Sequence, residues 1–294
     1  MKEKKVAAIV VTYNRFILLQ ECIESLRAQT YQQMSIIVVN NGSTDETSGW
    51  LEKQKDLIVI NQKNVGGAGG FYTGIKYACE HGFEFSWVMD DDVVADVDAL
   101  SNLICHTDKT EGFLCSRVLD TSMKMCNVPK ISLRKSEETN ELQWGNMLQE
   151  KLLMVDVASF VSVLIPSRLV YEVGLPFKLY FIWGDDTEYT TRISSKHISY
   201  MAIDSQVIHK RKIQKTISIF TEKDPNRLNN YFYLYRNRIS LQKSFSKKLI
   251  FGIHSIFQAF QLLLRFRWKS AYIVLKGIWA SLFFHPVIEY PQTC

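Results

Sequence analysis

Short apolar runs alternate with helix-like stripes over the first 90 residues of the chain. Continuous, β-branched apolar runs, typical of central strands buried on both faces, occur at 6–11, 35–40, 57–61 and 85–89. Between them, apolar residues at helical spacing predict helices at 17–29, 46–54 and 71–80. This order predicts an α/β fold, a Rossmann-like and mostly parallel sheet with helices on both faces.

The second half of the chain has a weaker pattern. It predicts a helix at 99–106, strand-rich segments at 112–119, 153–165 and 200–208, and mainly helices over 226–284. The polar stretch 121–150, which contains Trp144, is interpreted as a long loop near the site. We therefore expect an α/β domain over residues 1–230 and a C-terminal helical extension over residues 231–294.

Charge is divided unevenly along the chain. Residues 1–204 hold 20 Lys and Arg against 27 Asp and Glu, a net charge of −7. Residues 205–294 hold 15 against 3, a net charge of +12. A basic segment of this kind suits an anionic surface. Its aromatic residues are not interleaved with its cations as on a stacking platform for bases, so no nucleic-acid partner is expected.

The basic segment contains an apolar stretch, 249–264, without Asp, Glu, Lys or Arg. A spanning helix needs about 20 apolar residues, so this stretch is too short to cross a bilayer. Apolar helices flanked by cations are typical of helices that lie in the plane of an anionic membrane surface. A helical cap on the core, or a homodimer contact, fits the amphipathic pattern equally well.

The six cysteines include no CxxC pair and no metal-finger spacing, which indicates reduced thiols. The apolar run at 6–11 is too short for the core of a signal peptide. We therefore expect a cytoplasmic protein, peripheral on the inner face of the cell membrane.

Polar clusters follow four of the predicted elements, at 12–15, 40–43, 64–67 and 90–92. Ligands of parallel α/β sheets bind at the carboxyl ends of the strands, so four clusters at one edge predict a ligand site, although each alone would be only a turn. Asp90, Asp91 and Asp92 directly follow a buried strand. Three adjacent carboxylates repel one another unless a cation neutralises them, which favours a divalent metal.

Together these clusters resemble glycosyltransferase family 2, the inverting enzymes of the GT-A fold. The matching segments are Val10–Arg15, Val38–Asp45, Asn64–Gly67, Met89–Val93 and Trp183–Tyr189, within about residues 6–210. The resemblance implies a nucleotide-sugar donor, usually UDP- or dTDP-linked, and a divalent cation, Mn²⁺ or Mg²⁺.

The resemblance also implies roles for single residues. Asn41 occupies the position that reads the base in many members, although they carry Asp there. The donor-binding residues would be Thr12, Tyr13, Asn14, Arg15, Asn41, Asn64, Gly66, Gly67, Asp90 and Asp91. The metal ligands would be Asp90, Asp92 and His209.

Asp185 and Asp186 match the acidic catalytic motif of the family, with Asp186 as the general base and Asp185 as its neighbour. A carboxylate opposite the leaving group can deprotonate the attacking hydroxyl. Helix capping is the structural alternative for this pair. The acceptor would meet Trp183, Glu188 and Trp144; for Glu188, a surface ion pair with Arg192 is the alternative.

Among the subfamilies, the motifs look most like bacterial galactofuranosyltransferases, with dTDP-rhamnose rhamnosyltransferases of O-antigen and capsule synthesis as close competitors. The expected reaction moves galactofuranose from its UDP donor to a glycan acceptor carried on a polyprenyl diphosphate, in cell-surface polysaccharide synthesis. The alternative of another class is a non-catalytic module that binds sugar nucleotides. The sequence by itself leaves open the exact sugar, the acceptor, the linkage and the oligomeric state.

Overall fold

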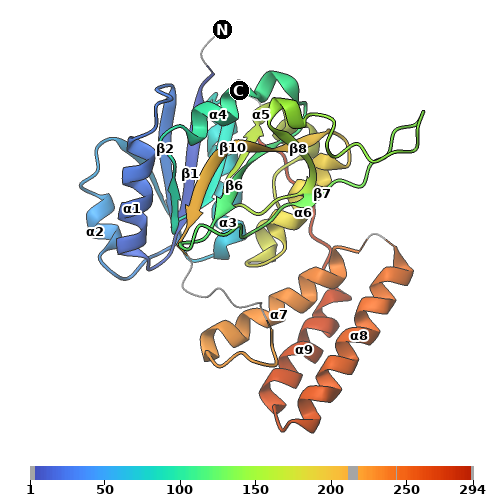
Figure 1. Ribbon diagram of the computed structural model, residues 1–294. Helices are drawn as coiled ribbons and strands as arrows, with labels where there is room; N and C mark the ends of the chain where they lie inside the picture. The colour runs from blue at the N-terminus through green and yellow to red at the C-terminus, as the bar shows by residue number, and fades with distance from the viewer. Residues whose placement is uncertain (1–3, 211–217, 243, 293–294) are drawn as a thin grey trace.

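The computed structural model describes residues 4–210, 218–242 and 244–292 and has an α/β sheet domain above a layer of three helices (Figure 1). One mixed sheet runs in the order β3-β2-β1-β4-β9-β6-β10-β8-β7, and β5 pairs with β10. The strands are β1 (Val6–Thr12), β2 (Met34–Asn40), β3 (Leu57–Asn61), β4 (Phe85–Asp90), β5 (Val93–Ala95), β6 (Leu114–Leu119), β7 (Lys130–Ile131), β8 (Leu152–Val157), β9 (Val163–Pro166) and β10 (Ser199–His209).

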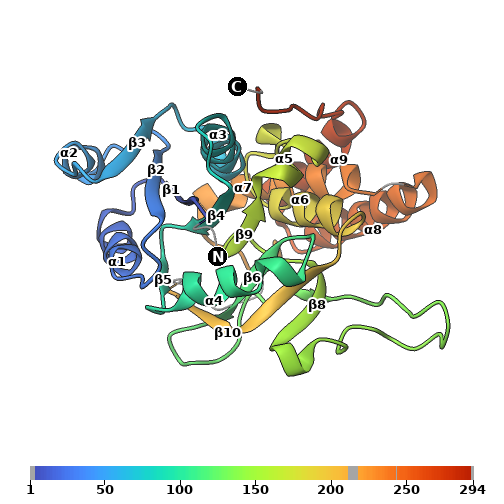
Figure 2. The ribbon, with the colours of Figure 1, turned by 90° about the horizontal axis from the view of Figure 1, so that it is seen from above.

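Helices cover both faces of the sheet. The helices are α1 (Phe16–Arg27), α2 (Thr47–Leu51), α3 (Gly66–Glu80), α4 (Ala99–Cys105), α5 (Ser167–Val173), α6 (Asp185–Ser194), α7 (Pro225–Ser240), α8 (Phe245–Leu264) and α9 (Trp268–Ser281), with 3₁₀ turns at Thr107–Lys109, Leu148–Glu150 and Lys178–Tyr180. Figure 2 shows α1 and α4 on one face and α3, α5 and α6 on the other. The strands β1, β2, β3, β4, β6 and β10 point the same way, while β8 and β9 run against them. The α/β fold with a mostly parallel sheet is confirmed.

The alternation of side chains along β1 builds the two cores. Every residue of β1 is buried, as its continuous apolar sequence predicts. Val6, Ala8 and Val10 pack against the α1 side, whereas the residues between them face the α3 side. Gly70 lets α3 approach this strand closely, because a Cβ there would lie 2.3 Å from a methyl group of Val11. β1 is therefore held from both sides.

The helical layer starts earlier than expected. Helix α7 begins at Pro225, so it crosses the boundary expected between residues 230 and 231. Asp224 caps it, because its carboxylate accepts a hydrogen bond from the backbone of Asn226 at 2.9 Å, and Pro225 occupies the first turn. Helices α7, α8 and α9 share a third core that includes Tyr231, Leu262 and Val274.

The chain after α9 returns to the sheet domain. Glu289 accepts a hydrogen bond from the Tyr72 hydroxyl at 2.6 Å and pairs with Lys178 at 2.8 Å. Its backbone carbonyl accepts from Leu175 at 2.7 Å. The helical layer is thus attached to the sheet domain at its end as well as at α7. No helix within the described residues combines the length and the apolar character needed to cross a membrane.

Candidate active site

The carboxyl ends of β1, β4 and β10 meet at one edge of the sheet. β1 and β4 are parallel neighbours with Val11 opposite Asp90. The three-residue strand β5, which the sequence analysis did not predict, pairs antiparallel with β10 and sets His209 opposite Val93. His209 therefore lies beside Asp92, although the two residues are far apart in the chain.

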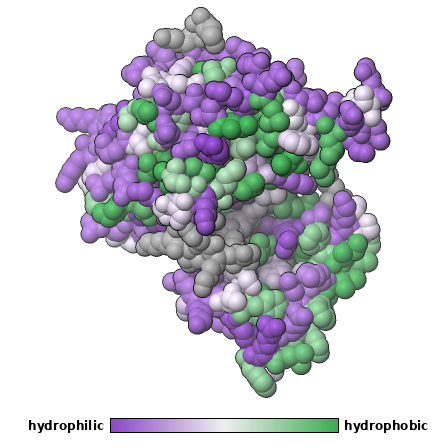
Figure 3. All heavy atoms as spheres, in the orientation of Figure 1, coloured by the Kyte–Doolittle hydropathy of each residue, from purple (hydrophilic) through white to green (hydrophobic). Residues whose placement is uncertain are grey.

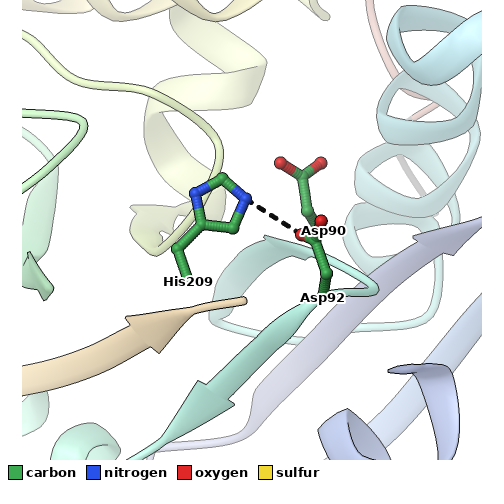
Figure 4. Close-up of side chains that lie close together, drawn as sticks. All are labelled: Asp90, Asp92 and His209. Carbon is green, nitrogen blue, oxygen red and sulfur yellow. Dashed lines mark ion pairs between the residues drawn. The ribbon is translucent and has the colours of Figure 1, made fainter. Parts of the chain in front are cut away.

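Asp90, Asp92 and His209 form one cluster (Figure 4). Their ligand atoms all lie within 4.8 Å of one another, and His209 Nε2 is 3.0 Å from Asp92 Oδ1. On its other side, His209 Nδ1 is 3.0 Å from Asn127 Oδ1. When Nδ1–H donates to Asn127, the lone pair of Nε2 is available for a metal. A metal-binding histidine usually donates its other ring N–H to such an acceptor.

The electrostatics of this cluster fit a divalent cation. Burial and the charges of Asp92 and Asp91 raise the pKa of Asp90 well above its usual range. Burial also opposes ionisation of Asp92, but the hydrogen bond and charge of His209, together with Arg15, outweigh it and lower the pKa of Asp92. Arg15 Nη1 lies 3.4 Å from Asp92 Oδ2. A bound cation would favour the ionised form of both carboxylates, and the imidazole ligand suits Mn²⁺ better than Mg²⁺, which prefers oxygen ligands.

Asp91 points away from this cluster into the protein. Its Oδ2 accepts a hydrogen bond from the buried Thr12 hydroxyl at 2.7 Å. Burial raises the pKa of Asp91 to about 7, although the bond from Thr12 opposes the shift. Thr12 and Asp91 thus join β1 to β4 through a buried hydrogen bond, and their expected contact with the donor stays a prediction.

The acidic pair begins helix α6. Asp185 is buried, whereas Asp186 is only partly buried and accepts hydrogen bonds from the backbone and hydroxyl of Thr187 at 2.6 and 3.2 Å. Burial and the charge of Asp186 raise the pKa of Asp185 to about 8. Burial raises the pKa of Asp186 too, but the bonds from Thr187 lower it in part. Asp186 is thus the more exposed carboxylate of the pair.

The glycine-rich residues 66–70 form the beginning of helix α3. Helix α3 begins at Gly66, where a helix start near residue 71 was expected. Asn64 Oδ1 accepts the backbone N–H of Gly66 at 2.9 Å. Gly66 has φ of +78°, and a Cβ there would lie 2.0 Å from the carbonyl oxygen of Phe181. Asn64 and Gly66 thus fix the backbone where α3 begins. Of Asn64, Gly66 and Gly67, which were expected to bind the donor, Gly67 is the one that lines the cleft described below.

Asn40 and Asn41 are buried and committed to protein partners. Asn41 Nδ2 donates to the carbonyl of Gly66 at 2.8 Å, and its Oδ1 accepts from Gln62 at 2.7 Å. Asn40 donates to Ser48 and Asn61 at 3.0 and 2.9 Å. The amide of Asn41 thus links β2 to the start of α3, and its expected role in reading the base stays a prediction.

The loop after β1 divides between exposed and site residues. Asn14 has φ of +53°, and its Oδ1 accepts the backbone N–H of Thr44 at 2.7 Å. Tyr13 is 45% exposed. Of Tyr13, Asn14 and Arg15, only Arg15 lines the cleft, while Asn14 ties this loop to the loop after β2.

The three residues expected to meet the acceptor differ in position. Trp183 lines the cleft and packs edge-to-face on Tyr231. Glu188 forms a 2.6 Å ion pair with Arg192, which is the structural alternative given above. Trp144 lies in the excursion before β8, and its carbonyl accepts the backbone N–H of Met154 at 3.0 Å. Glu188 and Trp144 do not line the cleft described below, and their expected contact with the acceptor stays a prediction.

One cleft of about 750 Å³ joins the metal cluster, the acidic pair and helix α7. Among its described walls are Asp90, Asp92, His209, Asp185 and Asp186, and also residues that the sequence analysis missed: Asn127, Phe71, Phe160, Arg227 and Asn230. No local pattern marks Asn127. The start of α7 at Asp224-Pro225 lies one residue before the helical region expected over 226–284, so only the expected domain boundary cut this helix.

The cleft lies at the carboxyl edge of the sheet, where parallel α/β sheets bind their ligands. Residues 7–152 match the family model described as glycosyl transferase family 2. The chain belongs to glycosyltransferase family 2.

Relatives and solved structures agree with this assignment. The galactofuranosyltransferase GlfT1 of Mycolicibacterium smegmatis is 28% identical over 197 residues, 64% of this chain and 65% of that protein, just under two thirds of its length. GlfT1 of Mycobacterium tuberculosis is 26% identical over 252 residues, 80% of this chain and 81% of that protein.

Two solved structures share the fold. TarS residues 1–349 of S. aureus have a TM-score of 0.56 at 13% identity, covering 94% of this chain and 91% of theirs. The mannosyltransferase PcManGT of Pyrobaculum calidifontis, in complex with GDP-Man and Mn²⁺, has a TM-score of 0.52 at 19% identity, covering 96% and 73%.

The metal cluster generates the first prediction. Mn²⁺ should increase the affinity of the protein for UDP, and Asp92→Ala should abolish that increase without changing the metal-free affinity. Asn127→Ala should weaken Mn²⁺ binding about 10- to 100-fold, because Asn127 orients the ligand histidine. Titration calorimetry with UDP, with and without Mn²⁺, measures all three. Equal UDP affinity with and without metal in the unchanged protein would contradict the prediction.

Proposed function

We propose that the protein transfers galactofuranose from UDP-galactofuranose to a glycan acceptor carried on a polyprenyl diphosphate lipid, with inversion at the anomeric carbon. The observation that carries the proposal is the meeting of the Asp90–Asp92–His209 cluster and the Asp185–Asp186 pair in one cleft. The similarity to a galactofuranosyltransferase over 80% of the chain supports the choice of sugar. A match of this length includes both the Asp90–Asp92–His209 cluster and the acidic pair, wherever it begins and ends.

The proposed chemistry uses the two groups differently. Asp186 accepts the proton of the acceptor hydroxyl while the hydroxyl oxygen attacks the anomeric carbon from the face opposite the diphosphate. The bond from that carbon to the diphosphate breaks, and the nucleoside diphosphate leaves with the electron pair. A divalent cation held by Asp90, Asp92 and His209 supplies positive charge for the diphosphate. Mn²⁺ is favoured by the ligand set and accompanies the donor in the similar mannosyltransferase.

The position of the two carboxylates of the pair supports Asp186 as the base. Both hydrogen bonds that its side chain accepts within the described residues fall on Oδ1, which leaves Oδ2 for an acceptor hydroxyl. Asp185 is buried, and burial together with the charge of Asp186 raises its pKa to about 8. Trp183, at the wall of the same cleft, offers a flat apolar ring to a sugar.

We include a membrane surface in the proposal because of the outer side of the helical layer. Figure 3 shows hydrophobic side chains along this side, over α8. Ile250, Phe257, Phe260 and Leu264 are each more than half exposed and lie on one face of α8, and Trp268 at the start of α9 is equally exposed. Exposed cations accompany them at Lys247, Arg265, Lys269 and Lys276. Apolar insertion combined with cations near the headgroups fits an anionic bilayer surface.

The donor is tested by a screen of nucleotide sugars. The purified protein with Mn²⁺ should transfer sugar from UDP-galactofuranose to a short polyprenyl-diphosphate-linked glycan, with the product identified by mass and NMR. UDP-galactopyranose, dTDP-rhamnose and GDP-mannose are the comparison donors. Preferential transfer from dTDP-rhamnose would replace the proposed sugar, and UDP binding without transfer or hydrolysis of any donor would favour a non-catalytic module.

Asp186→Asn should lower kcat about 10²- to 10⁴-fold while donor affinity persists, because the amide keeps the shape of the carboxylate but removes its basicity. In the unchanged enzyme, burial raises the pKa of Asp186, so activity should fall with decreasing pH from a point above the ordinary carboxyl range. This acid limb should disappear in Asp186→Asn. If Asp185→Asn is the inactive variant and Asp186→Asn keeps its activity, the roles of the two residues are reversed.

Membrane binding is tested by substitution, because truncation at residue 231 would cut helix α7. The intact protein should co-sediment with vesicles that contain phosphatidylglycerol at low salt, since each engaged cation contributes about 1 kcal/mol near such a surface, and high salt should weaken binding. Phe257→Glu with Phe260→Glu should reduce binding at least about tenfold. Val128→Glu with Leu133→Glu is the matched control, because these exposed apolar residues lie in the sheet domain. An intact protein that ignores such vesicles and sediments as a dimer would assign this face to a homodimer contact.

A further inference from the structure

The backbone between the 3₁₀ turn at Lys178–Tyr180 and helix α6 takes an unusual path. Phe181 and Trp183 have φ of +64° and +63°, and Gly184 has φ of +98°. Non-glycine residues rarely adopt this region, and such conformations persist only where the surroundings hold them. We call residues 180–184 the acidic-motif approach, because Asp185 and Asp186 follow directly.

One side chain of helix α7 holds this approach. Asn237 is buried, and its Nδ2 donates to the carbonyls of Tyr180 at 3.0 Å, Ile182 at 3.2 Å and Trp183 at 2.9 Å. Two N–H groups are thus shared among three carbonyl oxygens. The carbonyl of Tyr180 also accepts the backbone N–H of Ile182 at 2.7 Å and Nη2 of Arg236 at 3.3 Å. Within the described residues, the amide of Asn237 is the partner found for the carbonyls of Ile182 and Trp183.

The orientation of the Asn237 amide is itself fixed. Its Oδ1 accepts from Nε and Nη2 of Arg236 at 3.0 and 2.9 Å, which turns the NH₂ group toward the approach. The guanidinium of Arg236 lies 3.8 Å from the centre of the Phe284 ring, and its Nη2 donates to the carbonyl of Leu179 at 2.6 Å.

The approach also contacts the beginning of helix α3. The carbonyl of Phe181 accepts the backbone N–H of Ala68 at 3.1 Å, in the first turn of α3. The ring of Phe181 stacks on Tyr233 of α7 at 4.6 Å. The approach is therefore held between α3 and α7, and its far end fixes where α6 begins.

We infer that Asn237 is a positioning residue for the catalytic base: it holds the left-handed approach so that α6 starts with Asp186 in the cleft. This inference rests on the proposed role of Asp186. It assigns a part in the reaction to the helical layer, beyond residues 7–152 that the family model matches.

The experiment compares Asn237→Ala and Asn237→Ser in the full chain. Asn229→Ala is the matched control, because Asn229 is an exposed asparagine of the same helix. Hydrogen exchange by mass spectrometry should show faster amide exchange over residues 178–188 in Asn237→Ala and no change in the control. This measurement tests the clamp without any assumption about the reaction.

Steady-state kinetics on the same proteins test positioning. We expect Asn237→Ala to lower kcat by up to about 100-fold, because a small misplacement of a base is costly. The donor KM should change little, because the metal cluster lies at the ends of β4 and β10 and not in the approach. Asn237→Ser retains one donor group, so its kcat should lie between those of the unchanged protein and Asn237→Ala. The serine variant also provides the test if the alanine variant fails to fold. The acid limb of kcat should move to lower pH, since a loosened Asp186 is more hydrated and its pKa falls.

The outcomes separate the two hypotheses. Faster exchange in the approach with unchanged kcat and pH profile would overturn the inference, as would unchanged exchange in both Asn237 variants. Absence of transfer from every nucleotide sugar by the unchanged protein would instead refute the proposed function, while the exchange result would still decide whether Asn237 holds the approach.

Discussion

Mutual repulsion among buried carboxylates is the constraint on which the site depends. Asp90, Asp91, Asp92, Asp185 and Asp186 gather at one edge of the sheet, where burial and their neighbours' charges raise the pKa of most of them. The protein relieves part of this repulsion through Arg15 and His209 at Asp92 and through Thr12 at Asp91. A bound cation would relieve more of it, so the arrangement of these carboxylates suits positive charge.

The same constraint explains the division of labour between neighbouring acids. Asp91 joins β1 to β4 through the bond from Thr12, whereas Asp90 and Asp92 line the cleft. Asp185 and Asp186 both line the cleft, but Asp185 is the more buried, and burial with the charge of Asp186 raises its pKa to about 8. Residues that look equivalent in sequence thus differ in burial and in partners.

The helical layer belongs to the site as well as to the outer surface. Helix α7 faces the cleft with Arg227 and Asn230 and supports the approach to α6 through Asn237. It also packs against α9, where Gly277 lies so close that a Cβ would be 2.8 Å from the carbonyl of Phe232. A membrane or protein that binds α8 and α9 would therefore contact helices that pack directly on α7, a wall of the cleft.

The sequence by itself predicted β1 to β4, the helices between them and the edge that carries the polar clusters, but not β5 or α5. It also pointed to the residues of the Asp90–Asp92–His209 cluster and of the acidic pair. These follow from local patterns: β1 is apolar throughout, and carboxylates directly follow β4. The alternation of side chains could also have predicted that Asp91 faces away from Asp90 and Asp92. Tertiary structure alone decided that Asn41 faces inward, that Asn127 supports His209, and that Asn237 holds the approach to Asp186. Each depends on which carbonyl or amide a distant segment presents, and this is set by the packing of whole elements and leaves no trace in local periodicity.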